Sequence, residues 1–267
     1  MVVGLWAVII SAYFLLAPDK IMFMKFPADL AQYIELPKEA EENFFGANNA
    51  VNGWFFKNPR SDKVLLYSLG FGRTIGRNRD RCEALAEYSS VFVYDYKGCG
   101  KSCGHSNEQS MTDDACAAYD LLVKKYHYKP NQIIGYGESM GTAATAQLSL
   151  RRKLAGVIMV ASFPSWTAAA HAAAPIVAIY PSSCCPVFDS AKALARFTGP
   201  TLVIHSGKDE IIPLALGKEL FAVAAGVPKR FVVMPGSQHD YVIDQPEADK
   251  KLFDHSIRKF VETVHIN

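Results

Sequence analysis

The sequence lacks a dense run of basic residues, and its 267 residues carry a formal net charge of only +2 at pH 7. Proteins that bind nucleic acids present clustered Lys and Arg side chains to the phosphates, so this class of function has no electrostatic support here. Internal repeats are absent as well, and the length suits one α/β domain with a sizeable core. We therefore expect one globular domain with no nucleic-acid partner.

Cysteine is scarce, with six residues in the chain, and no two of them form a Cys-x-x-Cys motif. Six are too few to hold a chain of this length together through disulfides, and their spacing matches no common zinc site. The adjacent pair at 184–185 could bridge only with strain. We expect free thiols in a reducing compartment and no bound metal.

Apolar residues make up 50% of the chain and charged residues 20%, which is a globular composition. Short apolar runs, typical of strands buried on both faces of a sheet, alternate with stretches of helical periodicity. Strands are predicted at 41–45, 51–57, 64–69, 91–94, 132–136, 156–160, 201–205 and 230–234, and helices at 78–88, 112–126, 142–150, 214–225 and 248–264. This alternation indicates an α/β fold: a mostly parallel sheet with helices on both faces, begun by a hairpin of the first two strands.

The first 17 residues form a hydrophobic segment, because residues 2–17 are apolar apart from Ser11. As a helix they would span roughly 24 Å, less than the ~30 Å hydrocarbon core, and the apolar patch 21–24 could extend them. A membrane anchor is the favoured interpretation, with Lys20 and Lys25 placing the domain on the cytoplasmic side. A signal peptide, which would make the domain secreted or lumenal, and a buried or interfacial helix stay open.

Residues 135–141 read Gly-Tyr-Gly-Glu-Ser-Met-Gly, between a predicted strand and a predicted helix. Gly-x-Ser-x-Gly in this setting is the nucleophile elbow, a sharp turn that exposes the serine at the carboxyl end of a sheet. Gly137 and Gly141 are required because larger side chains would meet the neighbouring strand and helix. Ser139 also begins a helix, whose N-terminal amides favour negative charge. The alternative is an ordinary helix start made of small residues.

A serine nucleophile needs a base, and the base needs a carboxylate that orients it. In chains with this elbow the acid follows the serine and the histidine comes last. The loops after the last two predicted strands contain Asp209 and Glu210 in one and His239 in the other. We predict Ser139, Asp209 and His239 as the catalytic residues, with Glu210 the less favoured acid. His205, at the end of its strand, is predicted to be structural.

Acyl transfer also needs backbone donors that stabilise the oxyanion. One is predicted to be the amide of Met140, directly after the serine. The other is predicted to be the amide of Phe71, in the loop after the predicted strand 64–69. The Phe71 side chain would then narrow the acyl or leaving-group pocket.

Residues 163–198 interrupt the alternation of strands and helices and are rich in Ala, Pro and Ser. An insertion between core strands is a usual place for a cap over the site. We therefore expect a hydrophobic segment at 1–17 and a domain at 18–267, with a small cap at about 163–198.

Together these residues resemble the α/β-hydrolase superfamily over residues 42–261. Within it they resemble the small-cap group with an N-terminal membrane segment, which includes ABHD-type lipid hydrolases and protein depalmitoylases. The most specific stretch is residues 94–102, which read Tyr-Asp-Tyr-Lys-Gly-Cys-Gly-Lys-Ser. The resemblance implies a serine esterase, thioesterase or amidase that uses no metal or organic cofactor.

One position departs from that family's pattern. The family usually carries His-Gly-Asn after the first long central strand, and this chain has Leu69-Gly70-Phe71. The absent histidine normally braces the oxyanion loop, so its loss bears on the geometry of the donors and on the rate.

Hydrolysis of an acyl ester or thioester through an acyl-Ser139 intermediate is the favoured function. The expected substrate is a small molecule, a lipid or an acylated protein, met at a membrane. Two alternatives stay open. Leu69 favours a catalytically weak binding protein on the same fold. An aminopeptidase-like relative would cleave amides and would need an acidic group for the substrate amine, for which Glu138 is the one candidate and is better explained as structural.

Overall fold

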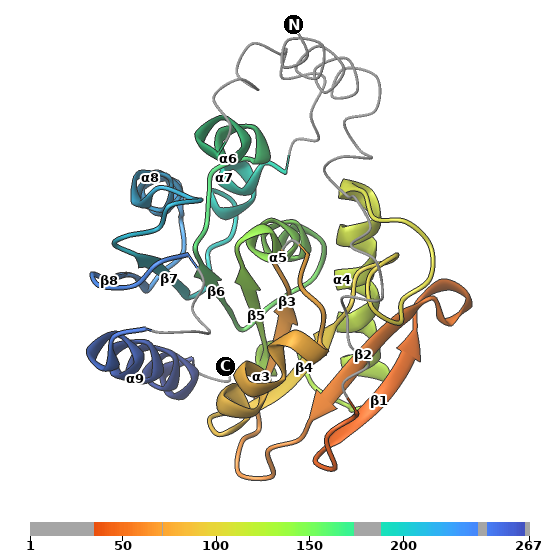
Figure 1. The fold of residues 1–267 in the computed structure, drawn as a ribbon. Helices are drawn as coiled ribbons and strands as arrows, with labels where there is room; N and C mark the ends of the chain where they lie inside the picture. Colours follow the sequence, from red (N-terminus) through yellow and green to blue (C-terminus); the bar gives the residue numbers. More distant parts are fainter. Residues whose placement is uncertain (1–34, 71, 174–187, 240–244, 265–267) are drawn as a thin grey trace, which may run out of the picture.

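The computed structural model describes residues 35–70, 72–173, 188–239 and 245–264 (Figure 1). An eight-stranded sheet runs through them in the order β1-β2-β4-β3-β5-β6-β7-β8. The strands are β1 (Ala40–Phe45), β2 (Val51–Phe56), β3 (Val64–Ser68), β4 (Ser90–Tyr94), β5 (Ile133–Glu138), β6 (Gly156–Val160), β7 (Thr201–Ser206) and β8 (Lys229–Met234). All neighbouring pairs from β4 to β8 are parallel, whereas β2 runs antiparallel to β1 and β4. The predicted hairpin and mostly parallel sheet are confirmed.

The central strands are mostly apolar, and helices cover both faces of the sheet. Every residue of β3, β4 and β6 is buried, as expected for parallel strands between two helical layers. The helices are α3 (Arg79–Ala86), α4 (Glu108–Lys124), α5 (Met140–Arg151), α6 (Trp166–Ala173), α7 (Ser190–Leu194), α8 (Leu214–Val223) and α9 (Glu247–Thr263), with short 3₁₀ turns at Ala47–Asn49, Gly76–Asn78 and Pro130–Gln132. Helices α3 and α9 cover one face, and α4, α5, α7 and α8 cover the other (Figure 1).

Helix α4 begins four residues earlier than the apolar pattern predicts. Asn107 caps it: its side chain accepts from the amide of Ser110, and the Ser110 hydroxyl accepts in return from the amide of Asn107. Asp114 is buried in the second turn of the helix and forms an ion pair with Lys97, at 2.7 Å.

The two ends of the predicted cap lie side by side between β6 and β7. Ser165 and Asp189 form an isolated antiparallel bridge, and the amide of Ala191 donates to the carbonyl of Pro164. Residues 174–187, including Cys184 and Cys185, lie outside the described residues, so the cap remains a prediction. The four cysteines within the described ranges form no disulfide with one another.

The predicted hydrophobic segment at 1–17 also lies outside the described residues. Among the helices that the structure describes, none combines the length and the apolar character needed to cross a membrane. The membrane anchor therefore stays a prediction.

Candidate active site

The elbow has the geometry that its sequence predicts. Strand β5 ends at Glu138, Ser139 follows with a left-handed φ of 52°, and α5 starts at the next residue. A Cβ on Gly137 would lie 2.6 Å from the carbonyl oxygen of Gly141, and one on Gly141 would lie 1.9 Å from the carbonyl oxygen of Ser68 on β3. Both positions therefore need glycine, because the turn brings helix and strand backbones too close for a side chain. Ser139 is held in a strained conformation at the carboxyl edge of the sheet.

Ser139, His239 and Asp209 meet at this edge from three separate loops. The Ser139 hydroxyl oxygen lies 3.1 Å from Nε2 of His239, and Nδ1 of His239 lies 2.9 and 2.8 Å from the two carboxylate oxygens of Asp209. A carboxylate can only accept, so Nδ1 carries the ring proton and Nε2 is left to accept from the serine hydroxyl. We call this arrangement the Ser-His-Asp chain.

The loop after β7 fixes the Asp209 carboxylate before it meets the imidazole. Its Oδ1 accepts from the amides of Ile211 and Ile212, at 3.0 and 2.7 Å, and the side chain is completely buried. Glu210, the less favoured acid, takes a different place: its carboxylate accepts from the backbone amide of His239 at 3.2 Å. The imidazole therefore faces Asp209 and not Glu210.

His205 has a structural position, as the sequence predicts. It is fully buried at the end of β7, and its Nε2 donates to the carbonyl of Ile212 at 2.8 Å. Burial lowers the pKa of His205, which favours the neutral ring. Its contact with the Ile212 carbonyl ties down the loop that carries Asp209.

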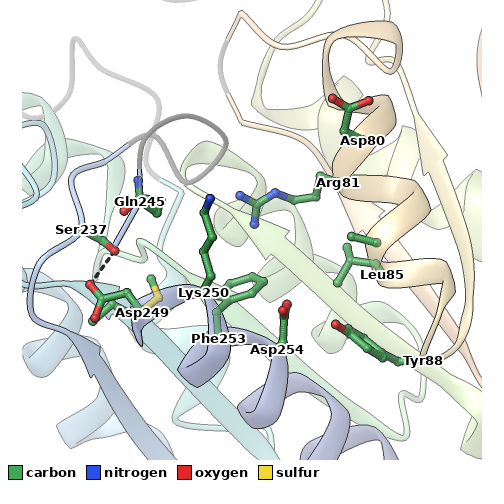
Figure 2. Close-up of a pocket in the computed structure, with 12 residues that line it drawn as sticks. Asp80, Arg81, Leu85, Tyr88, Ser237, Gln245, Asp249, Lys250, Phe253 and Asp254 are labelled. Carbon is green, nitrogen blue, oxygen red and sulfur yellow. Dashed lines mark hydrogen bonds between the residues drawn. The ribbon is translucent and has the colours of Figure 1, made fainter. Parts of the chain in front are cut away.

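The loop that carries His239 is fastened to the first turn of α9. Asp249, which is 4% exposed, accepts from the amide of Gly236 at 2.8 Å and from the hydroxyl of Ser237 at 2.7 Å (Figure 2). Sequence reasoning missed Asp249 because it lies in a helix whose pattern shows only an acidic first turn. Residues 240–244, directly after His239, lie outside the described residues.

Of the two predicted oxyanion donors, the structure describes one. Met140 is the first residue of α5 and is almost fully buried. Phe71 lies outside the described residues, but the backbone on its N-terminal side adjoins the elbow. A Cβ on Gly70 would lie 3.3 Å from the carbonyl oxygen of Glu138 and 3.4 Å from Cβ of Ser139. Gly70 thus lies against the serine turn.

Residues of the 94–102 stretch hold the loop between β3 and α3. The Tyr96 hydroxyl donates to the carbonyl of Leu69 at 3.1 Å, and the Asp95 carboxylate accepts from the amide of Ile75 at 2.9 Å. The Leu69 side chain, at the family's histidine position, is buried in the apolar core. Asp95 is itself buried, and burial raises its pKa to about 7. Both ends of this loop are therefore tied to the loop after β4.

A cavity of about 230 Å³ lies between α3 and α9 (Figure 2). Arg81 and Leu85 line it from α3, Lys250 and Phe253 from α9, and Ser237 from the histidine loop. Ser139 and His239 are not among its lining residues. In the part of the chain that is described, no cluster of three or more His, Cys, Asp or Glu side chains could hold a metal ion.

Known proteins share both the sequence pattern and the fold. The model of a family described as serine aminopeptidase, S33, matches residues 59–190. An uncharacterised protein of Mycobacterium tuberculosis is 32% identical over 214 residues, which are 79% of this chain and 74% of that protein. Human alpha/beta hydrolase domain-containing protein 17C is 30% identical over 200 residues, which are 71% of this chain and 58% of that protein.

Two solved esterase structures have the same fold. An esterase of Pyrococcus furiosus superposes with a TM-score of 0.69 at 17% identity, covering 88% of this chain and 93% of the esterase. A thermophilic esterase of Thermogutta terrifontis, solved with malate bound, gives a TM-score of 0.62 at 18% identity, covering 85% and 99%. Together with the elbow at Ser139, these similarities show that the chain belongs to the α/β-hydrolase superfamily and is a hydrolase of that fold.

Proposed function

We propose that this hydrolase cleaves acyl ester or thioester bonds through a covalent acyl-Ser139 intermediate. The observation that carries the proposal is the Ser-His-Asp chain, in which hydroxyl, imidazole and carboxylate lie within hydrogen-bond reach of one another. Three residues up to a hundred positions apart meet at one edge of the sheet, each in a loop that directly follows a parallel strand. Geometry of this kind activates an otherwise weak alcohol nucleophile.

In the first half of the reaction, Nε2 of His239 takes the hydroxyl proton as Oγ of Ser139 attacks the substrate carbonyl carbon. The oxyanion of the tetrahedral intermediate is stabilised at the N-terminus of α5 by the amide of Met140, with the amide of Phe71 as the proposed second donor. When the intermediate collapses, the bond to the alcohol or thiol breaks, and the imidazolium returns the proton to the leaving group.

In the second half, His239 removes a proton from water, and the water oxygen attacks the acyl carbon. When the second tetrahedral intermediate collapses, the bond to Oγ of Ser139 breaks, the acid leaves, and the imidazolium returns the proton to Oγ. Asp209 keeps the ring proton on Nδ1 and stabilises the imidazolium in both halves. The two loop amides that bind Asp209 oppose its rotation away from the ring.

The substrate class that we propose is a lipid ester or a lipidated thioester, met at a membrane surface. The apolar run at residues 2–17 supports this choice, and so does the resemblance to ABHD-type lipid hydrolases and protein depalmitoylases. Lys20 and Lys25, which follow this run, support the cytoplasmic side of that membrane.

Amide cleavage is the second candidate, because the matching family model is described as a serine aminopeptidase. It would need a carboxylate that is available to a substrate amine. Glu138 does not meet this need, since its carboxylate already contacts the Tyr67 hydroxyl and lies 4.0 Å from Arg81. We therefore favour esters and thioesters over amides.

Turnover measurements test the proposal directly. Purified wild type, Ser139→Ala and Ser149→Ala are assayed with p-nitrophenyl esters of increasing acyl length, an acyl thioester and amino-acid p-nitroanilides. Ser149, on the same helix, donates to the carbonyl of Ala146 and serves as the matched control. We expect ester and thioester turnover in wild type and control, and a loss of roughly 10⁴-fold or more in Ser139→Ala. Anilide turnover alone, or equal rates in all three proteins, would contradict the proposal.

A further inference from the structure

The residue before the nucleophile carries a carboxylate that two distant elements hold. Glu138 is the last residue of β5, and its side chain is 14% exposed. The hydroxyl of Tyr67, on β3, donates a hydrogen bond to one of its oxygens. Nη2 of Arg81, on α3, lies 4.0 Å from the other oxygen. Both oxygens of Glu138 are thus engaged one residue away from Ser139.

Tyr67 and Arg81 are suited to bind the charged Glu138 carboxylate in its largely buried position. Burial, together with the nearby Glu138 carboxylate, raises the pKa of Tyr67 well above its ordinary value, so the hydroxyl keeps its proton and donates. For Arg81, burial lowers the pKa, but Glu138 and Tyr136 outweigh burial and raise it, so the guanidinium stays charged. Arg81 and Glu138 thus place one positive and one negative charge in a largely buried part of the protein.

On the side away from Glu138, Arg81 contacts α9, and it borders the cavity between α3 and α9. Its side chain is 7% exposed, and its guanidinium carbon lies 5.1 Å from the centre of the Phe253 ring. Figure 2 shows the guanidinium reaching from α3 into the space that Lys250 and Phe253 line from α9. The cation is therefore held between the helix that follows β3 and the helix that follows β8.

The charge of Glu138 matters because the reaction creates a second negative charge nearby. The oxyanion forms at Ser139, and a carboxylate one residue away would repel it. The same carboxylate belongs to the residue that leads into the strained φ of 52° at Ser139. Loss of the contacts to the Glu138 carboxylate would allow the strained backbone at Ser139 to relax.

We propose that Tyr67 and Arg81 are positioning residues that clamp Glu138, and through it the strained backbone of Ser139, while the Arg81 guanidinium cancels the carboxylate charge beside the oxyanion. This inference rests on the proposed function of Ser139. It assigns to Arg81 an effect on the transition state more than on substrate binding, because the opposing charge appears only when the oxyanion forms.

The cavity allows a test in which charge and shape are separated. Arg81→Ala leaves a space that continues into the 230 Å³ cavity, and guanidinium ion can enter it. We expect kcat for a p-nitrophenyl ester to fall by about 10- to 100-fold with KM changed less than about threefold. Millimolar guanidinium should restore at least a third of the lost rate. Urea has nearly the same shape and no charge, so it should restore nothing.

Two further variants complete the test. Arg79→Ala is the matched control, since Arg79 lies on the same helix and pairs with Glu83 in a partly exposed position. It should keep wild-type kcat and show no response to guanidinium. The double variant Arg81→Ala with Glu138→Gln removes both charges and should be faster than Arg81→Ala alone.

Rescue by urea equal to that by guanidinium, wild-type kcat in Arg81→Ala, or a double variant no faster than Arg81→Ala would each overturn the inference. If Arg81→Ala does not fold, Arg81→Lys and Tyr67→Phe carry the test, and wild-type kcat in both would overturn it. Failure of the proposed function is recognised separately. It would leave Ser139→Ala active, whereas failure of this inference alone would leave Ser139 essential and the Arg81 variants unimpaired.

Discussion

At the scale of single residues, the imidazole of His239 decides what the site can do. It contacts the Ser139 hydroxyl on one side and the Asp209 carboxylate on the other. The order serine, acid, histidine along the chain was enough to predict these three residues, because each follows a strand whose carboxyl end lies at one edge of the sheet. By pattern the sequence favours Asp209 and keeps Glu210 as the less favoured acid. Their different hydrogen bonds separate them.

Asp209→Asn should lower kcat by about 10⁴-fold with little change in KM, because an amide can donate to Nδ1 and so favour the tautomer that cannot accept the serine proton. Steady-state kinetics with a p-nitrophenyl ester measures this loss. Glu210→Gln is the control, since Glu210 bonds only to the backbone amide of His239 in the described structure. It should stay within about tenfold of wild type. A larger loss of kcat in Glu210→Gln than in Asp209→Asn would show that Glu210 is the catalytic acid.

Asp95 gives the protein a pH-dependent stability. Burial raises its pKa from 3.8 to about 7, so between these values the folded chain binds more protons than the unfolded chain. Its contribution to the free energy of unfolding is therefore fully present below pH 4 and is lost as the pH rises through 7.

Asp95→Asn removes this titration while leaving an oxygen that can accept from the amide of Ile75. Urea unfolding at pH 5 and pH 8 should show wild type losing stability relative to the variant at the higher pH, by at most about 3 kcal/mol. A stability difference that is the same at both pH values would contradict this account of Asp95.

At the scale of elements, contacts between helices and loops determine where the reacting groups lie. The sequence predicts each strand and each main helix within a few residues, because buried strands and amphipathic helices leave clear periodicities. It misplaces the start of α4, where the cap uses Asn107 and Ser110 in place of the more familiar Ser or Thr followed by Glu. Contacts such as Asp249 to the histidine loop leave no local pattern, since the partners come from different elements.

Asp249→Ala tests the connection between α9 and the loop that carries His239. The change leaves the amide of Gly236 and the hydroxyl of Ser237 without their acceptor in a buried place, which should lower the free energy of unfolding by about 2–4 kcal/mol. Urea denaturation measures the loss. Lys251→Ala, at an exposed position on the same helix, should change stability by less than about 0.5 kcal/mol. Equal effects of the two changes would show that Asp249 does not hold the loop.

At the scale of the whole molecule, the fold brings together side chains that no motif connects. Tyr67, Arg81 and Glu138 come from β3, α3 and β5, and only the order of the strands makes β3 and β5 neighbours. The sequence predicts the α/β-hydrolase fold because its alternation of elements is regular. It assigned Glu138 a structural role but could not name its partners, since pairing of this kind depends on tertiary packing. The Phe71 donor and most of the cap stay predictions, because they fall outside the described residues.

The hydrophobic segment at 1–17 gives a prediction for the location of the intact chain. We expect the full chain to remain in the membrane fraction after carbonate extraction, and a form lacking residues 1–17 to become soluble. Because the Ser-His-Asp chain lies far along the sequence from this segment, kcat for a short soluble ester should be unchanged. Recovery of the full chain in the soluble fraction would contradict the anchor.

The most direct test of the central claim is to map the covalent adduct formed with a fluorophosphonate probe by mass spectrometry. We predict a single adduct on Ser139 in wild type, formed far more slowly in His239→Ala and absent in Ser139→Ala. An adduct on another residue, or no adduct in an active wild-type preparation, would contradict the account.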